Sequence, residues 1–267
     1  MGSQLRKAAL MALFSMISMS YVQAQPIARV AASFKLDVGP LTPITISFRS
    51  RFSQSDVHSQ AEVRTRGISS IFSEYNAVAE SFGLLDAQHI NPSQFTLTQH
   101  RREKSVLQWS TDGTLAMNRP AHKDAIVQAK VLKANAPNTA DPITAILRVA
   151  TSLGSSPCSS TQRVFDGQDV IDLTFTDTNE KTLSGKSIYR GRVRQCEVRW
   201  HAVAGRAAER GDRDEVYGIS FASLGTIVSG QQFWLPVSMT GSIKGLGFSA
   251  YATRIFINEQ ELVGKTP

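Results

Sequence analysis

Cysteine is scarce in this chain: Cys158 and Cys196 are the only two among its 267 residues. Two thiols are too few to hold a zinc ion alone, and the chain has no Cys-x-x-Cys motif of the redox type. In an oxidising compartment, a single pair of cysteines most simply forms one disulfide. We therefore predict a Cys158–Cys196 disulfide, which requires the two Cα atoms to approach within about 7 Å.

Catalytic and metal-binding motifs are also absent. The five histidines are scattered without metal-ligand spacing, and no His-Glu-x-x-His pair or calcium loop occurs. The Gly-x-Ser-x-Gly and Ser-x-x-Lys motifs of serine hydrolases are missing as well. The glycine-rich stretch 241–247 lacks the Lys-Ser/Thr pair of a phosphate-binding loop, so we interpret it as a hairpin turn. We expect no catalytic residue, no cofactor and no metal.

Long apolar runs are absent after residue 24. Before it, Arg6 and Lys7 precede the apolar stretch Ala8–Met19, and Val22-Gln23-Ala24 supplies a small-x-small cleavage pattern. About a dozen apolar residues are too few to cross ~30 Å of hydrocarbon, which argues against the alternative of an uncleaved anchor. The sequence predicts a signal peptide over 1–24, cleaved after Ala24, and an exported mature chain, 25–267, that forms a single domain without a transmembrane segment.

The charge balance is moderately basic. Removing Arg6 and Lys7 with the signal peptide leaves 27 Lys and Arg against 22 Asp and Glu, a formal charge of +5. Such an excess suits either ordinary solubility or attraction to anionic surfaces such as lipid headgroups. Export itself argues against nucleic acid as a partner.

Alternation of apolar and polar residues dominates the mature chain. Ile44, Ile46 and Phe48, for example, alternate with polar residues as in a half-buried antiparallel strand. Further strands are predicted within 34–38, 58–66, 75–82, 95–97, 106–110, 162–166, 170–177, 189–205 and 248–257. The intervening segments are predicted as a loose lead-in at 26–32, one or two helical turns at 67–72, a long loop at 119–140 with a strand or short helix at 125–132, and an exposed loop at 205–215.

One helix is predicted among these strands, from Asp141 to Gly154. Aspartate is a favoured N-cap because its carboxylate accepts backbone N–H bonds, and Pro142 suits the first helical position. Four apolar residues form a stripe at helical spacing: Ile143, Ile146, Leu147 and Ala150. A short helix among so many strands must pack this stripe on the sheet.

The strand predicted at 189–205 carries the second cysteine. Alternation places Cys196 beside Val198 and Trp200 on one face, with charged residues opposite. We therefore expect Cys196 on the buried face, a suitable position for a disulfide. The two cysteines then bracket a predicted hairpin, and the three tryptophans are interpreted as core residues.

Three aspartates, Asp166, Asp172 and Asp177, are the nearest approach to a paired-carboxylate site. A glycosidase needs two carboxyl groups roughly 5–10 Å apart across a cleft. Asp172 lies on the polar face of its predicted strand and nothing brings a partner across, so a solvated face is the simpler interpretation. A similar choice, between an anionic ligand and an exposed sheet face, applies to Arg190, Arg192, Arg194 and Arg199.

Several short sequences occur in a fixed order along the chain. They are Ala61-Glu62-Val63-Arg64-Thr65-Arg66-Gly67, Asp141-Pro142-Ile143-Thr144-Ala145-Ile146-Leu147, Arg163-Val164-Phe165-Asp166-Gly167, Asp172-Leu173, Tyr189-Arg190-Gly191, Val203-Ala204-Gly205 and Leu235-Pro236-Val237, with Cys158 and Cys196 among them. From roughly Phe34 to Ile257, this ordered set resembles the domain-of-unknown-function family numbered 3108, a family of exported bacterial proteins.

The resemblance implies a mainly β protein of the Gram-negative periplasm. It implies a large curved antiparallel sheet, a β-spiral or half-barrel similar to lipoprotein-carrier folds, with one short helix packed on it. It implies no enzymatic activity, because no catalytic residue set is available to carry over. Fold alone does not fix function.

Three hypotheses for function follow. The first is a non-enzymatic protein of cell-envelope maintenance that binds a lipid-like, hydrophobic ligand or an envelope protein partner in a cavity of the sheet. The second is an enzyme acting on cell-wall polymer through carboxylates such as Asp166 or Asp172. The third is a structural scaffold module, which would present an exposed apolar patch rather than a pocket.

Overall fold

The computed structural model describes residues 28–262 except 40, 66–75, 87–88, 101–103, 118–129, 132, 135–138, 152–155, 212–213, 229–230 and 244. The predicted signal peptide, the helical turns predicted at 67–72 and most of the predicted loop at 119–140 lie outside the described residues. Within that loop, residues 130–131 and 133–134 are helical and Val131 is fully buried, which favours the short helix over the strand.

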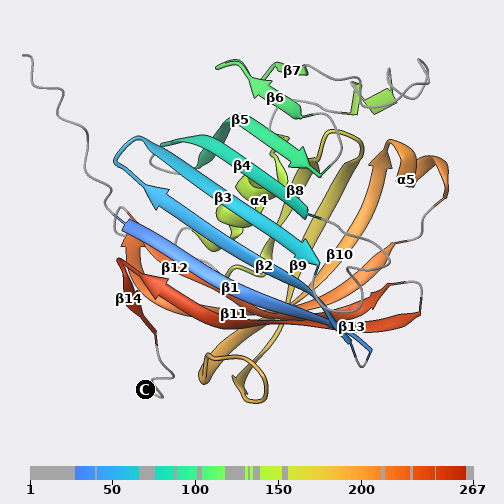
Figure 1. Ribbon diagram of the computed structural model, residues 1–267. Coiled ribbons are helices and arrows are strands. Elements are labelled where there is room, and N and C mark those ends of the chain that lie inside the picture. Colours follow the sequence, from blue (N-terminus) through green and yellow to red (C-terminus); the bar gives the residue numbers. More distant parts are fainter. Residues whose placement is uncertain are drawn as a thin grey trace, which may run out of the picture.

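The described chain forms one antiparallel sheet of fourteen strands, with short helices (Figure 1). The strands are β1 (Ala28–Val38), β2 (Leu41–Phe52), β3 (Asp56–Thr65), β4 (Asn76–Leu85), β5 (Ile90–Gln99), β6 (Ser105–Trp109), β7 (Leu115–Met117), β8 (Ser159–Phe165), β9 (Val170–Leu183), β10 (Gly191–Ala204), β11 (Glu215–Val228), β12 (Gln231–Ile243), β13 (Leu246–Ile257) and β14 (Gln260–Glu261). The predicted fold class, a large antiparallel sheet with a short helix, is therefore confirmed.

Strand order shows that the sheet does not close. Strands consecutive in sequence pair along two meanders, β1 to β7 and β8 to β13, and β1 pairs with β13 to join them. The path therefore ends at β7 on one edge and β8 on the other. Antiparallel neighbours need only short connections, and the long connection between the two edges carries the helix α4 (Pro142–Ala150).

Helix α4 lies between the two meanders and contacts both. It packs against β3, β4 and β5 of the first meander and against β8 and β12 of the second. Asp141 caps it as predicted, because its Oδ1 accepts hydrogen bonds from the backbone N–H groups of Ile143 and Thr144 at 2.9 and 3.0 Å. The described helix ends at Ala150, four residues before the predicted end.

The core is built around this helix. Ile143, Leu147 and Ala150 belong to the main apolar cluster, whereas Val149 belongs to a second cluster around the two cysteines. Burial of an aliphatic side chain contributes about 1.5–3 kcal/mol. Most side chains of α4 are apolar and buried. The helix is therefore a core helix rather than an amphipathic helix with one solvent-exposed face.

The loop between β9 and β10 fills a gap in the sheet. β12 and β13 pair only from Ser238 and Tyr251 to their turn. Beyond that point, the Ser187 hydroxyl donates to the Val237 carbonyl of β12 at 3.3 Å, and the Ile188 N–H donates to the Ala252 carbonyl of β13 at 2.7 Å. The loop thus supplies partners to both separated strands.

Pro236 accounts for the separation of β12 from β13. It lies in β12 opposite Phe221 of β11, and a proline has no N–H to donate to a second neighbour. The Leu235-Pro236-Val237 sequence therefore lies where β12 leaves β13 and meets the inserted loop.

Three sequence predictions need correction. The lead-in at 26–32 is β strand from Ala28, since Ala28, Val30 and Ala32 are buried and face the core. The loop at 205–215 contains the short helix α5 (Arg206–Glu209), fixed by burial of Ala207. The turn predicted over 241–247 is shorter, because β12 continues to Ile243 and β13 begins at Leu246.

No helix among the described residues is both long and apolar enough to cross a membrane.

Candidate functional site

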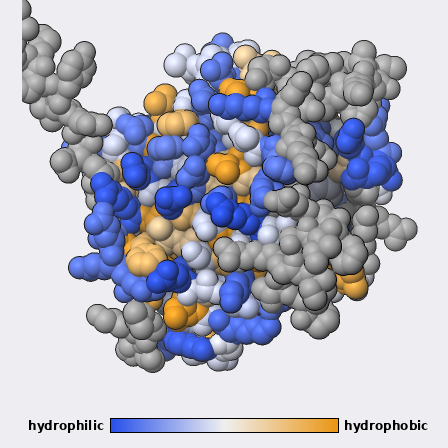
Figure 2. Space-filling model, in the orientation of Figure 1, coloured by the Kyte–Doolittle hydropathy of each residue, from blue (hydrophilic) through white to orange (hydrophobic). Residues whose placement is uncertain are grey.

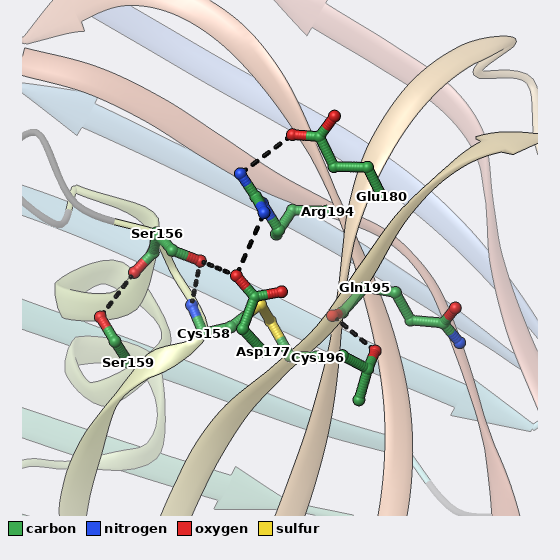
Figure 3. The surroundings of a disulfide bond; sticks show 9 residues. Ser156, Cys158, Ser159, Asp177, Glu180, Arg194, Gln195 and Cys196 are labelled. Carbon is green, nitrogen blue, oxygen red and sulfur yellow. Dashed lines mark hydrogen bonds and ion pairs between the residues drawn. A yellow bond between two sulfur atoms is a disulfide. The ribbon is translucent and has the colours of Figure 1, made fainter.

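The two cysteines meet in the second meander, where the structure joins them by a disulfide with Cα atoms 5.2 Å apart (Figure 3). Cys158 precedes β8 and Cys196 lies on β10, so the pair brackets three strands rather than a hairpin. Neighbouring strands lie about 4.8 Å apart, which would separate β8 from β10 by about twice that distance. The turn that carries Cys158 must therefore fold over β9, and the register shift at Gln195/Cys196 accompanies this approach.

A polar network borders the disulfide on the side of β9 (Figure 3). Arg194 forms ion pairs with Asp177 at 3.2 Å and Glu180 at 2.9 Å. The Ser156 hydroxyl donates to Asp177 at 3.2 Å and accepts from the Cys158 N–H at the same distance. Asp177 and Arg194 therefore hold the cysteine turn in place.

The other two candidate carboxylates also have structural partners. Asp172 on β9 accepts two 2.8 Å hydrogen bonds from the guanidinium of Arg163 on β8. Asp166 accepts the backbone N–H groups of Gln168 and Asp169, both at 2.8 Å, and burial raises its pKa. The first carboxylate stabilises a strand pair and the second a turn.

Two of the short family-like sequences meet at this turn. The Asp169 carboxylate accepts the N–H of Ala207 at 2.9 Å, just after Val203-Ala204-Gly205. A Cβ on Gly205 would lie 2.4 Å from both the Asp169 Oδ1 atom and the Gln168 carbonyl oxygen, and Gly205 has φ +104°. The close approach and the left-handed backbone both require glycine. These sequences thus lock the β8–β9 turn to the end of β10.

A cleft at the rim of the sheet has a different character. It lies where the end of α4 meets β4, β5 and the turn between β6 and β7, and its volume is about 280 Å³. Its lining consists of Leu84, Asn91, Pro92, Ser93, Trp109, Ser110, Thr111, Asp112, Gly113, Thr139 and Arg148. Its apolar wall consists of Leu84, Pro92 and Trp109, and the other lining residues are mostly polar. We call it the rim cleft.

Arg148 is the principal charged group on the α4 side of the rim cleft. Its Nε donates a 2.7 Å hydrogen bond to the Ile90 carbonyl, which fixes the side chain against β5. Burial lowers the Arg148 pKa, while Asp141 and Asp86 act in the opposite direction. A guanidinium nevertheless stays charged in proteins and presents five N–H donors in a fixed plane.

The outer lip of the rim cleft combines polar and apolar groups. Hydrogen bonds from Ser110 and Thr114 lower the pKa of exposed Asp112 to about 2, so this carboxylate is ionised throughout the physiological range. Leu84 is 51% exposed, and Phe82, two residues earlier on the same face of β4, is 37% exposed. The cleft is therefore an amphiphilic site that is open to solvent.

The described ranges contain no group of three or more His, Cys, Asp or Glu side chains placed to hold an ion.

Of the three tryptophans predicted as core residues, Trp109 is buried and Trp200 is half-buried. Trp234 is half-buried against the disulfide cluster.

Sequence reasoning identified the cysteines, the capped helix and the three aspartates, but not the rim cleft. Its residues come from five separate stretches of the sequence and have no common motif. The one available signal was Arg148, a charge in the last turn of an otherwise apolar helix.

Comparisons with known proteins do not assign this chain to a family. No family model matches the chain, and no curated protein matches it either. A solved structure described as a beta-barrel-like protein of domain of unknown function DUF1849 from Brucella abortus aligns with 86% of this chain and 97% of its own. The TM-score is 0.43 and the identity is 10%. The resemblance to family 3108 stays a prediction.

Proposed function

We propose that this chain is a non-enzymatic periplasmic protein of cell-envelope maintenance, of the type that the family 3108 resemblance implies, and that it binds a lipid-like ligand at the rim cleft. The observation that carries the proposal is the pairing of an apolar wall with the fixed guanidinium of Arg148. An amphiphile would lay its apolar part on Leu84, Pro92 and Trp109 and direct its polar end toward Arg148.

The size of the cleft limits the ligand. Small-molecule sites commonly occupy about 300–1,000 Å³, and the rim cleft, at about 280 Å³, lies just below that range. It fits a single-chain amphiphile or one end of a larger lipid. Because α4 and its apolar neighbours occupy the interior of the described sheet, the ligand is assigned to the rim rather than to the space under the helix.

The proposal that the chain is exported rests on two arguments. The first is the leader pattern of residues 1–24, with cleavage after Ala24. The second is the Cys158–Cys196 pair, because disulfides persist in oxidising compartments such as the periplasm.

The proposal is tested by purifying the chain from the periplasm and extracting it with organic solvent. Mass spectrometry is expected to find one class of amphiphile at close to one molecule per chain. Protein that carries no amphiphile, and that takes up none from a total envelope lipid extract, would refute the ligand proposal.

A scaffold role is the second candidate, and one observation favours it. Phe82, beside the rim cleft, and Leu84, in its lining, form an exposed apolar pair that an envelope protein partner would cover. The enzyme hypothesis has no comparable support, since Asp166 and Asp172 are held by the β8–β9 turn and by Arg163. Replacing both aspartates by asparagine is expected to leave the cellular phenotype unchanged.

A further inference from the structure

A second hollow, distinct from the rim cleft, lies on the outer face of the sheet at the junction of the two meanders. Its volume is about 400 Å³, and its lining comes from β1, β2, β13 and the turn after β13. Figure 2 shows that hydrophilic residues cover most of the outer surface over the first strands, with apolar residues between them. We call this hollow the arginine groove.

Strand register explains the shape of the groove. Ala31 on β1 lies opposite Arg49 on β2 and opposite Phe256 on β13. A methyl group between two long side chains leaves an empty space above the strand. The floor of the groove is therefore Ala31, and the Phe256 ring forms one wall.

The next row of the sheet adds two more cations. Arg29 on β1 lies directly opposite Arg51 on β2, and like charges directly opposite each other in a sheet destabilise it. The Arg29 guanidinium forms a 2.5 Å ion pair with Glu259, in the turn after β13. Three arginines thus surround one hollow that has a single acidic residue in its lining.

Arg49 and Arg51 lack an acidic partner within the described ranges. Their neighbours across β3 are Gln60 and His58. Two acidic residues lie two positions further along β3, one on each side. Glu62 forms its own 2.5 Å ion pair with Arg64, and the Asp56 carboxylate accepts a 3.2 Å hydrogen bond from the Ser55 hydroxyl. Two exposed guanidinium groups without a described acidic partner thus give the groove a local charge of +2.

We propose that the arginine groove docks this protein on a membrane surface by binding phosphate-bearing headgroups of anionic lipids. Guanidinium groups form paired hydrogen bonds with phosphate oxygens. The apolar floor at Ala31 and the Phe256 ring suit the glycerol and upper acyl region of such a lipid, which a free phosphate ion or an acidic peptide would not use. The groove acts independently of the rim cleft.

Vesicle flotation tests the proposal with the full exported chain. Vesicles of phosphatidylcholine, with and without phosphatidylglycerol, are compared for wild type, Arg49→Gln/Arg51→Gln and Ala31→Leu. The matched control is Lys181→Gln/Arg192→Gln, which removes two exposed charges from β9 and β10. Circular dichroism checks the folding of every variant.

Wild type is expected to bind only the vesicles that contain phosphatidylglycerol. Arg49→Gln/Arg51→Gln should lower the partition coefficient about 30-fold, the effect of two arginines at an anionic surface. Ala31→Leu should lower it several-fold with no change in charge, whereas the control pair should stay near wild type.

Three outcomes would overturn the proposal. Equal losses of vesicle binding in Arg49→Gln/Arg51→Gln and in the control pair would indicate that the overall positive charge binds the membrane, rather than the groove. Unchanged vesicle binding by Ala31→Leu would show that the lipid does not contact the groove floor. Thermal stabilisation by inorganic phosphate without any vesicle binding would assign the groove to a free anion instead.

Discussion

The Ser81 hydroxyl on β4 donates a 3.0 Å hydrogen bond to Oδ2 of Asp141, the residue that caps α4. The other carboxylate oxygen, Oδ1, accepts the first backbone N–H groups of the helix. Asp141 is fully buried, and the Thr144 hydroxyl lies 3.0 Å from that of Ser81. One side chain thus both starts the helix and ties it to the first meander, which places Arg148 at the rim cleft two turns later.

Replacing Asp141 tests this link. Asp141→Ala removes the cap and leaves the Ser81 hydroxyl and two backbone N–H groups without their partner, so the free energy of unfolding should fall by about 2–4 kcal/mol. Asp141→Asn keeps an acceptor for the helix and should remain within about 1 kcal/mol of wild type. Urea unfolding followed by circular dichroism measures both, and equal losses in the two variants would contradict the capping role.

The same residue predicts a pH dependence. Burial raises the folded-state pKa of Asp141 above its ordinary value of 3.8. The folded chain then holds this proton to higher pH than the unfolded chain does, so its contribution to stability is complete below pH 3.8 and is lost as the pH rises through the folded-state pKa. The stability of wild type relative to Asp141→Asn should therefore fall over that interval, and a rise would contradict the assignment.

The Cys158–Cys196 disulfide should contribute strongly to stability. The cysteines are 38 residues apart, and a closed loop of that length is worth about 3–4 kcal/mol in the chain-entropy model. Cys158→Ser/Cys196→Ser should lower the free energy of unfolding by this amount, and reductant should affect only the wild type. Two free thiols in denatured protein purified from the periplasm would disprove the bridge.

Gly205 makes a sharp prediction about the turn lock. Gly205→Ala places a methyl group 2.4 Å from two oxygen atoms at a positive φ, and backbone strain with overpacking should cost about 3 kcal/mol or more. Gly211→Ala is the control, since its φ of +65° is also positive but no atom lies within 4 Å of the added carbon. It should cost only about 1–2 kcal/mol. Similar losses at both glycines would show that the contact with Asp169 is unimportant.

Local patterns predicted much of this fold because they depend on neighbouring residues. Period-two alternation located most strands, and Asp141-Pro142 located the start of α4 to the residue. The prediction of a loose lead-in at 26–32 was wrong. The inward-facing residues Ala28 and Ala32 are small, so their alternation with Arg29 gave only a weak strand pattern. β11 (Glu215–Val228) was missed, as its glycines and serines interrupt the apolar pattern.

Contacts between distant segments could not be predicted from the sequence, for a different reason. The pairing of β1 with β13 and the insertion of Ser187 and Ile188 between two strands join segments far apart in the chain. The arginine groove depends on which residue lies opposite Ala31, and the rim cleft on where a helix meets a distant turn. Neither strand register across the sheet nor helix placement leaves a local signature.

Binding of a fluorescent fatty acid tests the central claim most directly, with displacement by unlabelled lipid as the readout. The wild-type chain should bind one molecule, and Leu84→Ser should weaken binding at least about tenfold, because it removes roughly 1.5–3 kcal/mol of apolar contact. Leu246→Ser, the same change at an exposed leucine of β13, should bind like wild type. Equal affinity in all three proteins, or no saturable binding by the wild type, would contradict a ligand site at the rim cleft.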